Sequence, residues 1–299
     1  MASSLLAALV AVLFGVVLVL VIVRAMFGSV SRVRVERFAR RQGLVITPGN
    51  GNLVIAYLGI TRRWRVLGLG AGVLLTAAWS LRDSQITVNA LTAFAGWFIG
   101  GLVAEYRIAS IEPSARRAAS LEPRLLRRQI GTAARVLLLI LVAVTVIGAG
   151  GCLLAATDGR DVDGPQVFGY LAAAVLTLGL PVLVGRHVLS RPRPLAVTFD
   201  RQRADDALRD RSLHVLAGCA IALTAFPAAN LALQLGHALA GTDAQGPVRA
   251  LGLVLELAGP IGGWVVATRS RSRPQSGPRP AADAAGPAVA AGSEVAGPS

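Results

Sequence analysis

Lysine is missing from this sequence altogether, and charged residues of any kind make up only 15% of its 299 residues. Soluble domains carry roughly 25% charged residues. Hydrophobic residues account for 54% of the chain and are gathered in long runs. This balance argues against a water-soluble globule and predicts an integral membrane protein. All 30 basic residues are arginine, which is typical of a GC-rich genome.

Cysteine is almost absent, and so are the motifs of common enzymes. Cys152 and Cys219 form no CxxC pair and no Cys/His cluster, so no zinc or redox site is predicted. The two fall at different depths of the predicted bundle, too far apart for a disulfide, so both should be free thiols. The sequence has no GxSxG and no HExxH, and the absence of lysine excludes a Walker motif. We therefore expect no cofactor, no metal and no enzyme activity.

Seven apolar runs are long enough to cross a bilayer, which takes about 20 residues, within a range of about 17–25. They predict an all-α, polytopic transmembrane helix bundle, with six or eight spans as the alternatives. The first run lacks a preceding positive region and an A-x-A cleavage site, so we expect an uncleaved anchor. The seven runs are Ser4–Val23, Val66–Leu81, Ile86–Tyr106, Val136–Ala156, Val167–Gly185, Leu213–Leu235 and Ala250–Ala267.

Arginine is concentrated in alternate loops between these runs. Residues 24–65 hold nine, residues 107–135 hold seven, residues 186–212 hold seven, and four follow the last run. The other loops keep only Arg82, Arg160 and Arg249. The positive-inside rule then places the N-terminus outside the cell and the C-terminus in the cytoplasm. The expected location is the cytoplasmic membrane of a bacterium. The basic loops would face anionic lipid, which accounts for the net charge of +14 without nucleic acid.

The chain therefore divides into a transmembrane helical domain, residues 1–267, and a tail, residues 268–299. From residue 274 onward the tail is rich in Pro, Gly, Ala and Ser, and no pattern in it could bury a core. We predict that the tail is disordered in the cytoplasm.

Two basic loops carry the pattern of amphipathic helices lying on the membrane surface. "SRVRVERFARRQG" has Ser31 as a cap, Val35 and Phe38 on one side, and Gly43 at the stop. "SLEPRLLRRQIG", residues 120–131, repeats the theme. In the third loop Asp200 is expected to cap a helix in which Asp205 and Arg209 pair at i,i+4. Such loops either set topology alone or provide a docking surface for another membrane protein.

Two stretches suggest an internal repeat. "RRWRVLGLGAGVLLTAA" begins the second run and "RSLHVLAGCAIALTAFP" begins the sixth, which would fit a same-orientation 3+1+3 plan known among small sugar transporters. Pro181, Pro227 and Pro260 lie in the last three runs, whereas the first three contain no proline. Composition alone could also produce two such similar apolar runs.

Glu256 is the one carboxylate well inside an apolar run, "LVLELAGP". It lies roughly 10 Å below the outer surface at 1.5 Å per residue, and Asn230 lies at a similar depth. Asn89 and Thr92 enter the third span at a comparable level, so the four residues form a candidate intramembrane polar site. An ionised carboxylate there costs on the order of 3 kcal/mol unless it is paired or protonated.

Two interpretations of this site stay open. It could couple a proton or substrate, with Pro260 exposing carbonyls to a cavity. Alternatively, Glu256 and Asn230 could form an interhelical hydrogen bond, which adds about 0.6 kcal/mol on average. Glu105, at the inner end of the third span beside Arg107, is expected to face headgroups or a neighbouring arginine.

Four stretches resemble an uncharacterised family of polytopic membrane proteins from high-GC Gram-positive bacteria: "AYLGITRRWRVLG", "FAGWFIGGLVAE", "RRAASLEPR" and "ADDALRDRSLHVLAG". The resemblance covers roughly residues 36 to 235 and implies location and architecture, but no activity and no site residues. We expect a non-enzymatic membrane component, structural or accessory to other membrane proteins. The alternative is a small transporter that uses the site around Glu256 and Asn230. Oligomeric state is not predicted.

Overall fold

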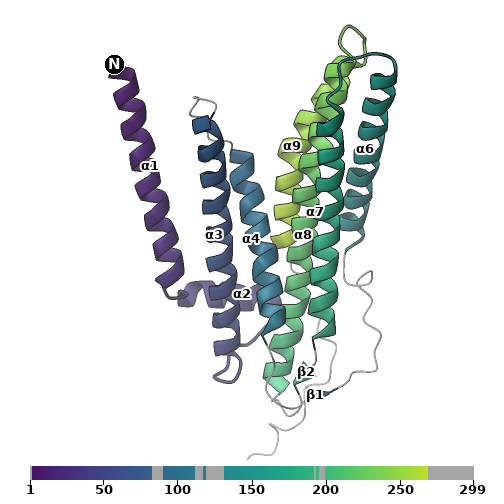
Figure 1. Cartoon of the computed structure of the whole chain (residues 1–299). Helices are drawn as coiled ribbons and strands as arrows, with labels where there is room; N and C mark the ends of the chain where they lie inside the picture. The colour runs from purple at the N-terminus through teal and green to yellow at the C-terminus, as the bar shows by residue number, and fades with distance from the viewer. Residues whose placement is uncertain are drawn as a thin grey trace, which may run out of the picture.

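The computed structural model describes residues 2–82, 90–111, 117–118, 131–191, 193–194 and 199–268. In these ranges the secondary structure is helical apart from one pair of two-residue strands, so the predicted all-α class is correct. The helices run side by side as a bundle, with α2 lying across one end (Figure 1). The elements are α1 Ala2–Phe27, α2 Arg32–Gln42, α3 Gly51–Arg82, α4 Ala90–Ser110, β1 Arg117–Ala118, α6 Thr132–Thr157, α7 Gly164–Ser190, β2 Arg193–Pro194, α8 Phe199–Ala238 and α9 Gln245–Thr268.

Helix α8 is the centre of the bundle. It spans 40 residues and packs against α4, α6, α7 and α9, with a smaller contact to α3. The apolar stretch of α8 that is long enough to cross a membrane is 89% buried inside the bundle. The corresponding stretches of α6, α7 and α9 are only 22–28% buried. Many of the buried residues of α8 are alanine, including Ala217, Ala222 and Ala225, whose small side chains let neighbouring helices approach from several sides.

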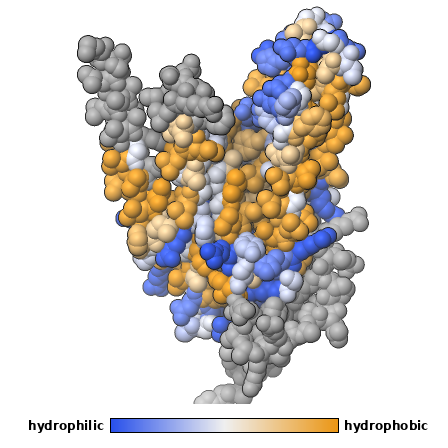
Figure 2. All heavy atoms as spheres, in the orientation of Figure 1, coloured by the Kyte–Doolittle hydropathy of each residue, from blue (hydrophilic) through white to orange (hydrophobic). Residues whose placement is uncertain are grey.

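The surrounding helices direct large apolar side chains outward. Leu139, Ile147, Val175 and Leu257 are more than half exposed, as are many like them. Apolar residues cover the middle of the bundle and hydrophilic ones lie toward its two ends (Figure 2). A surface of this kind fits lipid rather than water.

Four described helices are long and apolar enough to cross a membrane: α6, α7, α8 from Asp200, and α9. The count rises to five if residues 15–27 and α2, bent by 70° at their junction, form one broken span. The structure thus supports a membrane protein with several spans. The predicted count of seven is not confirmed.

The described parts of the arginine-rich loops lie at one end of the bundle, which we call the basic end (Figure 1). Strand β1 pairs antiparallel with β2, so that Arg117 lies opposite Pro194 and Ala118 opposite Arg193. This pairing joins the loops 107–135 and 186–212, and α2 lies at the same end (Figure 1). The hairpin between α6 and α7 and the turn between α8 and α9 lie at the opposite end.

The amphipathic helix predicted from Ser31 to Gly43 is present as α2. Ser31 is its N-terminal flanking residue in extended conformation, and Gly43 ends it with a left-handed φ of 62° that a residue with a Cβ would adopt only under strain. Val35 is buried and Phe38 packs on Tyr57 of α3, with ring centroids 6.0 Å apart. The second amphipathic helix, predicted at residues 120–131, lies almost wholly outside the described residues.

Two helix pairs pack closely through glycine. A Cβ on Gly68 of α3 would collide with the backbone of Gly96 and Gly100 of α4. Likewise, a Cβ on Gly218 of α8 would collide with Gly263 of α9. These are the corresponding pairs in the suggested 3+1+3 repeat, which itself stays a prediction.

Candidate functional site

Asn230 does not form the predicted hydrogen bond to Glu256; its side chain bonds to two other residues. The Asn230 amide donates to the carbonyl oxygen of Phe226 at 2.8 Å, and its oxygen accepts from the Tyr170 hydroxyl at 3.3 Å. Glu256 is half-buried on α9. Within the described residues no hydrogen bond or ion pair reaches its carboxyl group. Asn230 therefore joins α8 to α7, a helix that the sequence did not suggest as its partner.

Of the other two members of the predicted site, the structure describes only Thr92. Thr92 is half-buried on α4, and its backbone carbonyl packs against Gly72 of α3. Asn89 lies outside the described residues. The part of the chain that the structure describes thus places Thr92 in the α3–α4 contact and Asn230 in the α7–α8 contact.

A different polar cluster lies near the basic end, around Glu105 of α4. Glu105 is fully buried. One carboxyl oxygen accepts from the Tyr57 hydroxyl of α3 at 2.9 Å, and the other accepts from the Ser212 hydroxyl of α8 at 2.5 Å. The expectation that Glu105 faces headgroups or an arginine was therefore wrong. We call Tyr57, Glu105 and Ser212 the three-helix junction.

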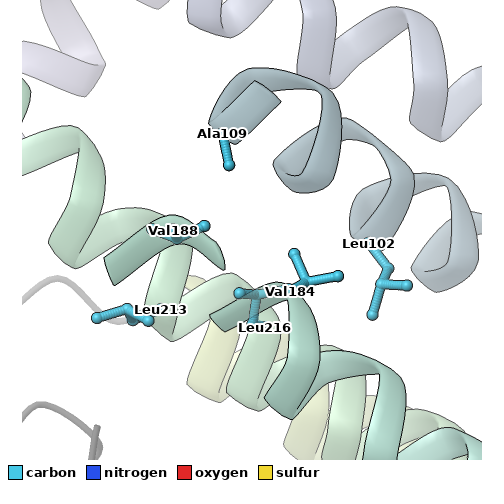
Figure 3. Packing of buried hydrophobic residues seen from close by; sticks show 6 residues of the cluster. All are labelled: Leu102, Ala109, Val184, Val188, Leu213 and Leu216. Atoms are coloured by element: carbon cyan, nitrogen blue, oxygen red, sulfur yellow. The ribbon is translucent and has the colours of Figure 1, made fainter. Parts of the chain in front are cut away.

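A hydrophobic cluster at the meeting of α4, α7 and α8 includes residues one turn from Glu105 and next to Ser212 in the chain. Figure 3 shows this packing, in which side chains of α4 lie opposite those of α7 and α8. The cluster consists of Leu102, Ala109, Val184, Val188, Leu213 and Leu216. Buried hydrogen bonds gain strength from the low local dielectric, and losing one partner leaves the others unsatisfied.

Two arginines add positive charge beside the junction. The charges of Arg65 and Arg211 both act on the Glu105 carboxyl group. Arg65 lies over the ring of Trp97, with 5.6 Å between its guanidinium carbon and the ring centroid. Arg211 donates to the backbone carbonyl of Ala267, at the end of α9. The junction with its arginines therefore touches α3, α4, α8 and α9.

A second buried ionic group ties the end of α7 to α8. Arg209 Nε donates to the Asp205 carboxylate at 2.8 Å, which confirms the predicted i,i+4 pair. Arg209 also donates to the Arg191 carbonyl at 2.9 Å, and the Arg191 guanidinium lies 4.0 Å from Asp205. Burial lowers the pKa of Arg191 from its usual value; Asp205 acts against this shift and Arg209 adds to it. Asp200, the predicted cap, lies in the first turn of α8 instead.

These clusters are suited to holding helices together. Cys152 and Cys219 are both free, as predicted, and both are buried. No group of three or more His, Cys, Asp or Glu side chains is arranged to hold a metal ion in the described residues. His187 meets Ser110 at 3.2 Å and stacks near Tyr106.

Sequence reasoning missed the junction because it began the second and sixth spans too late in the chain. Helix α3 begins at Gly51, well before the predicted boundary at Val66, so Tyr57 is helical and not part of a loop. Helix α8 begins at Phe199, before the predicted Leu213, which places Ser212 within it. A usable signal was present: Glu105, Arg65 and Arg211 all fall at the inner ends of predicted spans and carry opposite charges.

Comparison with known proteins gives no further guide to the site, since no family model matches the chain and no curated protein or solved structure matches it significantly.

Proposed function

We propose that this chain is a seven-span protein of a bacterial cytoplasmic membrane, with its N-terminus outside and its basic end in the cytoplasm. In that membrane it acts as a non-enzymatic structural or accessory component of a larger membrane assembly. Its relatives would be the polytopic proteins of high-GC Gram-positive bacteria that the sequence resembles.

The observation that carries this proposal is the closure of the three-helix junction. Glu105 is the most deeply buried carboxyl group in the described bundle, and both of its oxygens accept hydrogen bonds from other helices. The hydrogen bonds from Tyr170 to Asn230 and between Thr177 and Thr224 also join helices. Polar groups engaged with one another in this way favour a packing role.

Extraction of the protein from its native membrane into polymer-bounded lipid discs tests the accessory role. A tagged full-length chain should co-purify with one or more defined membrane proteins at a near-constant ratio, measured by quantitative mass spectrometry. A tagged, unrelated multi-span protein of equal abundance serves as the control. Recovery of the chain alone, at the same yield from independent preparations, would contradict the proposal.

The alternative is a small transporter, and the observation that favours it is the placement of Glu256. This carboxyl group is half-buried in the middle of α9, one turn before Pro260, with no hydrogen-bond partner among the described residues. Proline removes a backbone donor, which leaves a carbonyl free to line a cavity.

Proton flux into liposomes separates the two candidates. Purified chain is reconstituted with a trapped pH-sensitive dye, and Glu256→Gln is compared with the native chain. The accessory role predicts no flux above empty liposomes and no effect of the substitution. A flux that Glu256→Gln abolishes would establish the transporter in its place.

A further inference from the structure

Four arginines converge where α1, α2 and α3 meet at the basic end. Helix α1 carries Arg24 in its last turn, α2 carries Arg34, and α3 carries Arg62 and Arg63. Arg62 holds the corner together, because its guanidinium donates to the carbonyls of Gly28 and Ser29 in the connection between α1 and α2. We call these four residues the arginine corner.

The charges that act on Arg62 are all positive. Burial lowers the pKa of Arg62 from its usual value, and the positive charges of Arg34, Arg63 and Arg24 lower it further. Glu36, the acidic residue of α2, is instead paired with Arg32 at 2.8 Å. The Nε of Arg62 is buried and has no hydrogen-bond partner within the described residues. A concentration of like charge is stabilised by an anion.

The surroundings of the arginine corner show which anion fits. Phe27 at the end of α1 is 83% exposed, Val23 is 47% exposed, and Val33 of α2 is 58% exposed. Helix α2 turns away by 70° from the last part of α1, so these apolar side chains flank the arginines at a helix elbow. An apolar surface beside a cationic one matches a lipid, whose acyl chains lie along α1 while its headgroup meets the arginines.

We propose that the arginine corner is a specific binding site for the phosphate of an anionic phospholipid headgroup. The guanidinium groups of Arg24, Arg34 and Arg63 bind the phosphate oxygens, and Arg62 positions the corner through its hydrogen bonds to Gly28 and Ser29. This proposal rests on the membrane location proposed above, but not on the accessory role. General electrostatic attraction would involve all of the arginine-rich loops. The proposed site instead assigns the binding of anionic lipid to the four residues of the arginine corner.

Native mass spectrometry of the purified full-length chain, titrated with lipid in mild detergent, tests the site. The test variant is Arg24→Gln with Arg34→Gln and Arg63→Gln; Arg62 is kept because it joins α1–α2 to α3. The control variant is Arg37→Gln with Arg40→Gln and Arg186→Gln. These three arginines are also exposed and lie toward the basic end, so both variants lose the same charge.

The native chain should bind phosphatidylglycerol and cardiolipin more tightly than phosphatidylcholine. Because three arginines are lost, the corner variant should weaken binding of the anionic lipids by about a hundredfold, and the control variant by much less. Both variants should keep the melting temperature of the native chain.

Three results would overturn the site. Equal weakening in both variants would mean that the attraction is spread over the basic end. Equal binding of phosphatidylcholine would remove the role of negative charge, and displacement of the lipid by millimolar inorganic phosphate would remove the role of the acyl chains. None of them affects the co-purification test, so this proposal and the accessory role can fail separately.

Discussion

At the scale of single residues, Glu105 has the largest consequence for the bundle. The carboxyl group receives one hydrogen bond from α3 and one from α8, and it is fully buried. Removing it leaves two hydroxyl groups unsatisfied in a dry environment, which is more damaging than losing an exposed polar contact. Glu256 is only half-buried and offers a matched carboxylate for comparison.

Glu105→Ala should therefore destabilise the protein by about 1–3 kcal/mol, because two buried hydroxyl groups lose their acceptor. Glu105→Gln should have a smaller effect, since an amide keeps the size and can still hydrogen-bond to both hydroxyl groups. Glu256→Gln should change stability little. The measurement is the temperature at which half of the detergent-purified protein is lost from the monodisperse peak in size-exclusion chromatography. Equal melting for Glu105→Ala and Glu256→Gln would contradict the junction.

The two cysteines provide a second test at this scale. Cys152 and Cys219 are 0% and 1% exposed, respectively. Neither should react with a hydrophilic maleimide in the folded protein, and both should react after unfolding in SDS. A gel shift with a maleimide of high mass counts the modified thiols. Modification of either residue under native conditions would mean that the packing of α8 is looser than the structure indicates.

At the scale of helices, close approach through glycine decides which helices pair. Gly96 of α4 lies against the backbone of Gly68, whereas Gly169 of α7 has nothing within 4 Å of the position where a Cβ would stand. Both lie inside helices and both would gain helix propensity from alanine, so they differ only in what the added methyl group meets.

Gly96→Ala should separate α3 from α4 and destabilise the protein by about 1–3 kcal/mol, the usual range for overpacking. Gly169→Ala should be neutral or slightly stabilising. The same thermal assay measures both variants. If the two variants melt alike, the contact between α3 and α4 is not as close as described.

At the scale of the whole molecule, the antiparallel order of the helices puts the described basic segments at one end. Two independent contacts support this: β1 pairs with β2, and Arg62 reaches the connection between α1 and α2. The positive-inside rule predicts that this basic end faces the cytoplasm. Chemical labelling from the two sides of the membrane can test this orientation.

Single cysteines at opposite ends test the proposed orientation. Asp161→Cys, in the hairpin between α6 and α7, should react with an impermeant maleimide on intact cells. Arg37→Cys, on α2, should react only after the membrane is opened. Both positions are exposed, and the native cysteines are buried and give a low background. Labelling of Arg37→Cys but not of Asp161→Cys in intact cells would reverse the orientation.

The sequence by itself determined the helical class, the membrane setting and the identity of α2, because these follow from composition, run length and capping residues that act locally. It also placed Asp205 and Arg209 correctly, since an i,i+4 pair depends only on helix geometry.

Tertiary structure alone decided that α8 is central, that Asn230 bonds to Tyr170, and that Glu105 is buried between Tyr57 and Ser212. These facts depend on which helices meet and how far each one extends beyond its apolar run. Hydropathy records the preference of each segment for lipid, but it carries no information about which neighbour satisfies a particular polar group.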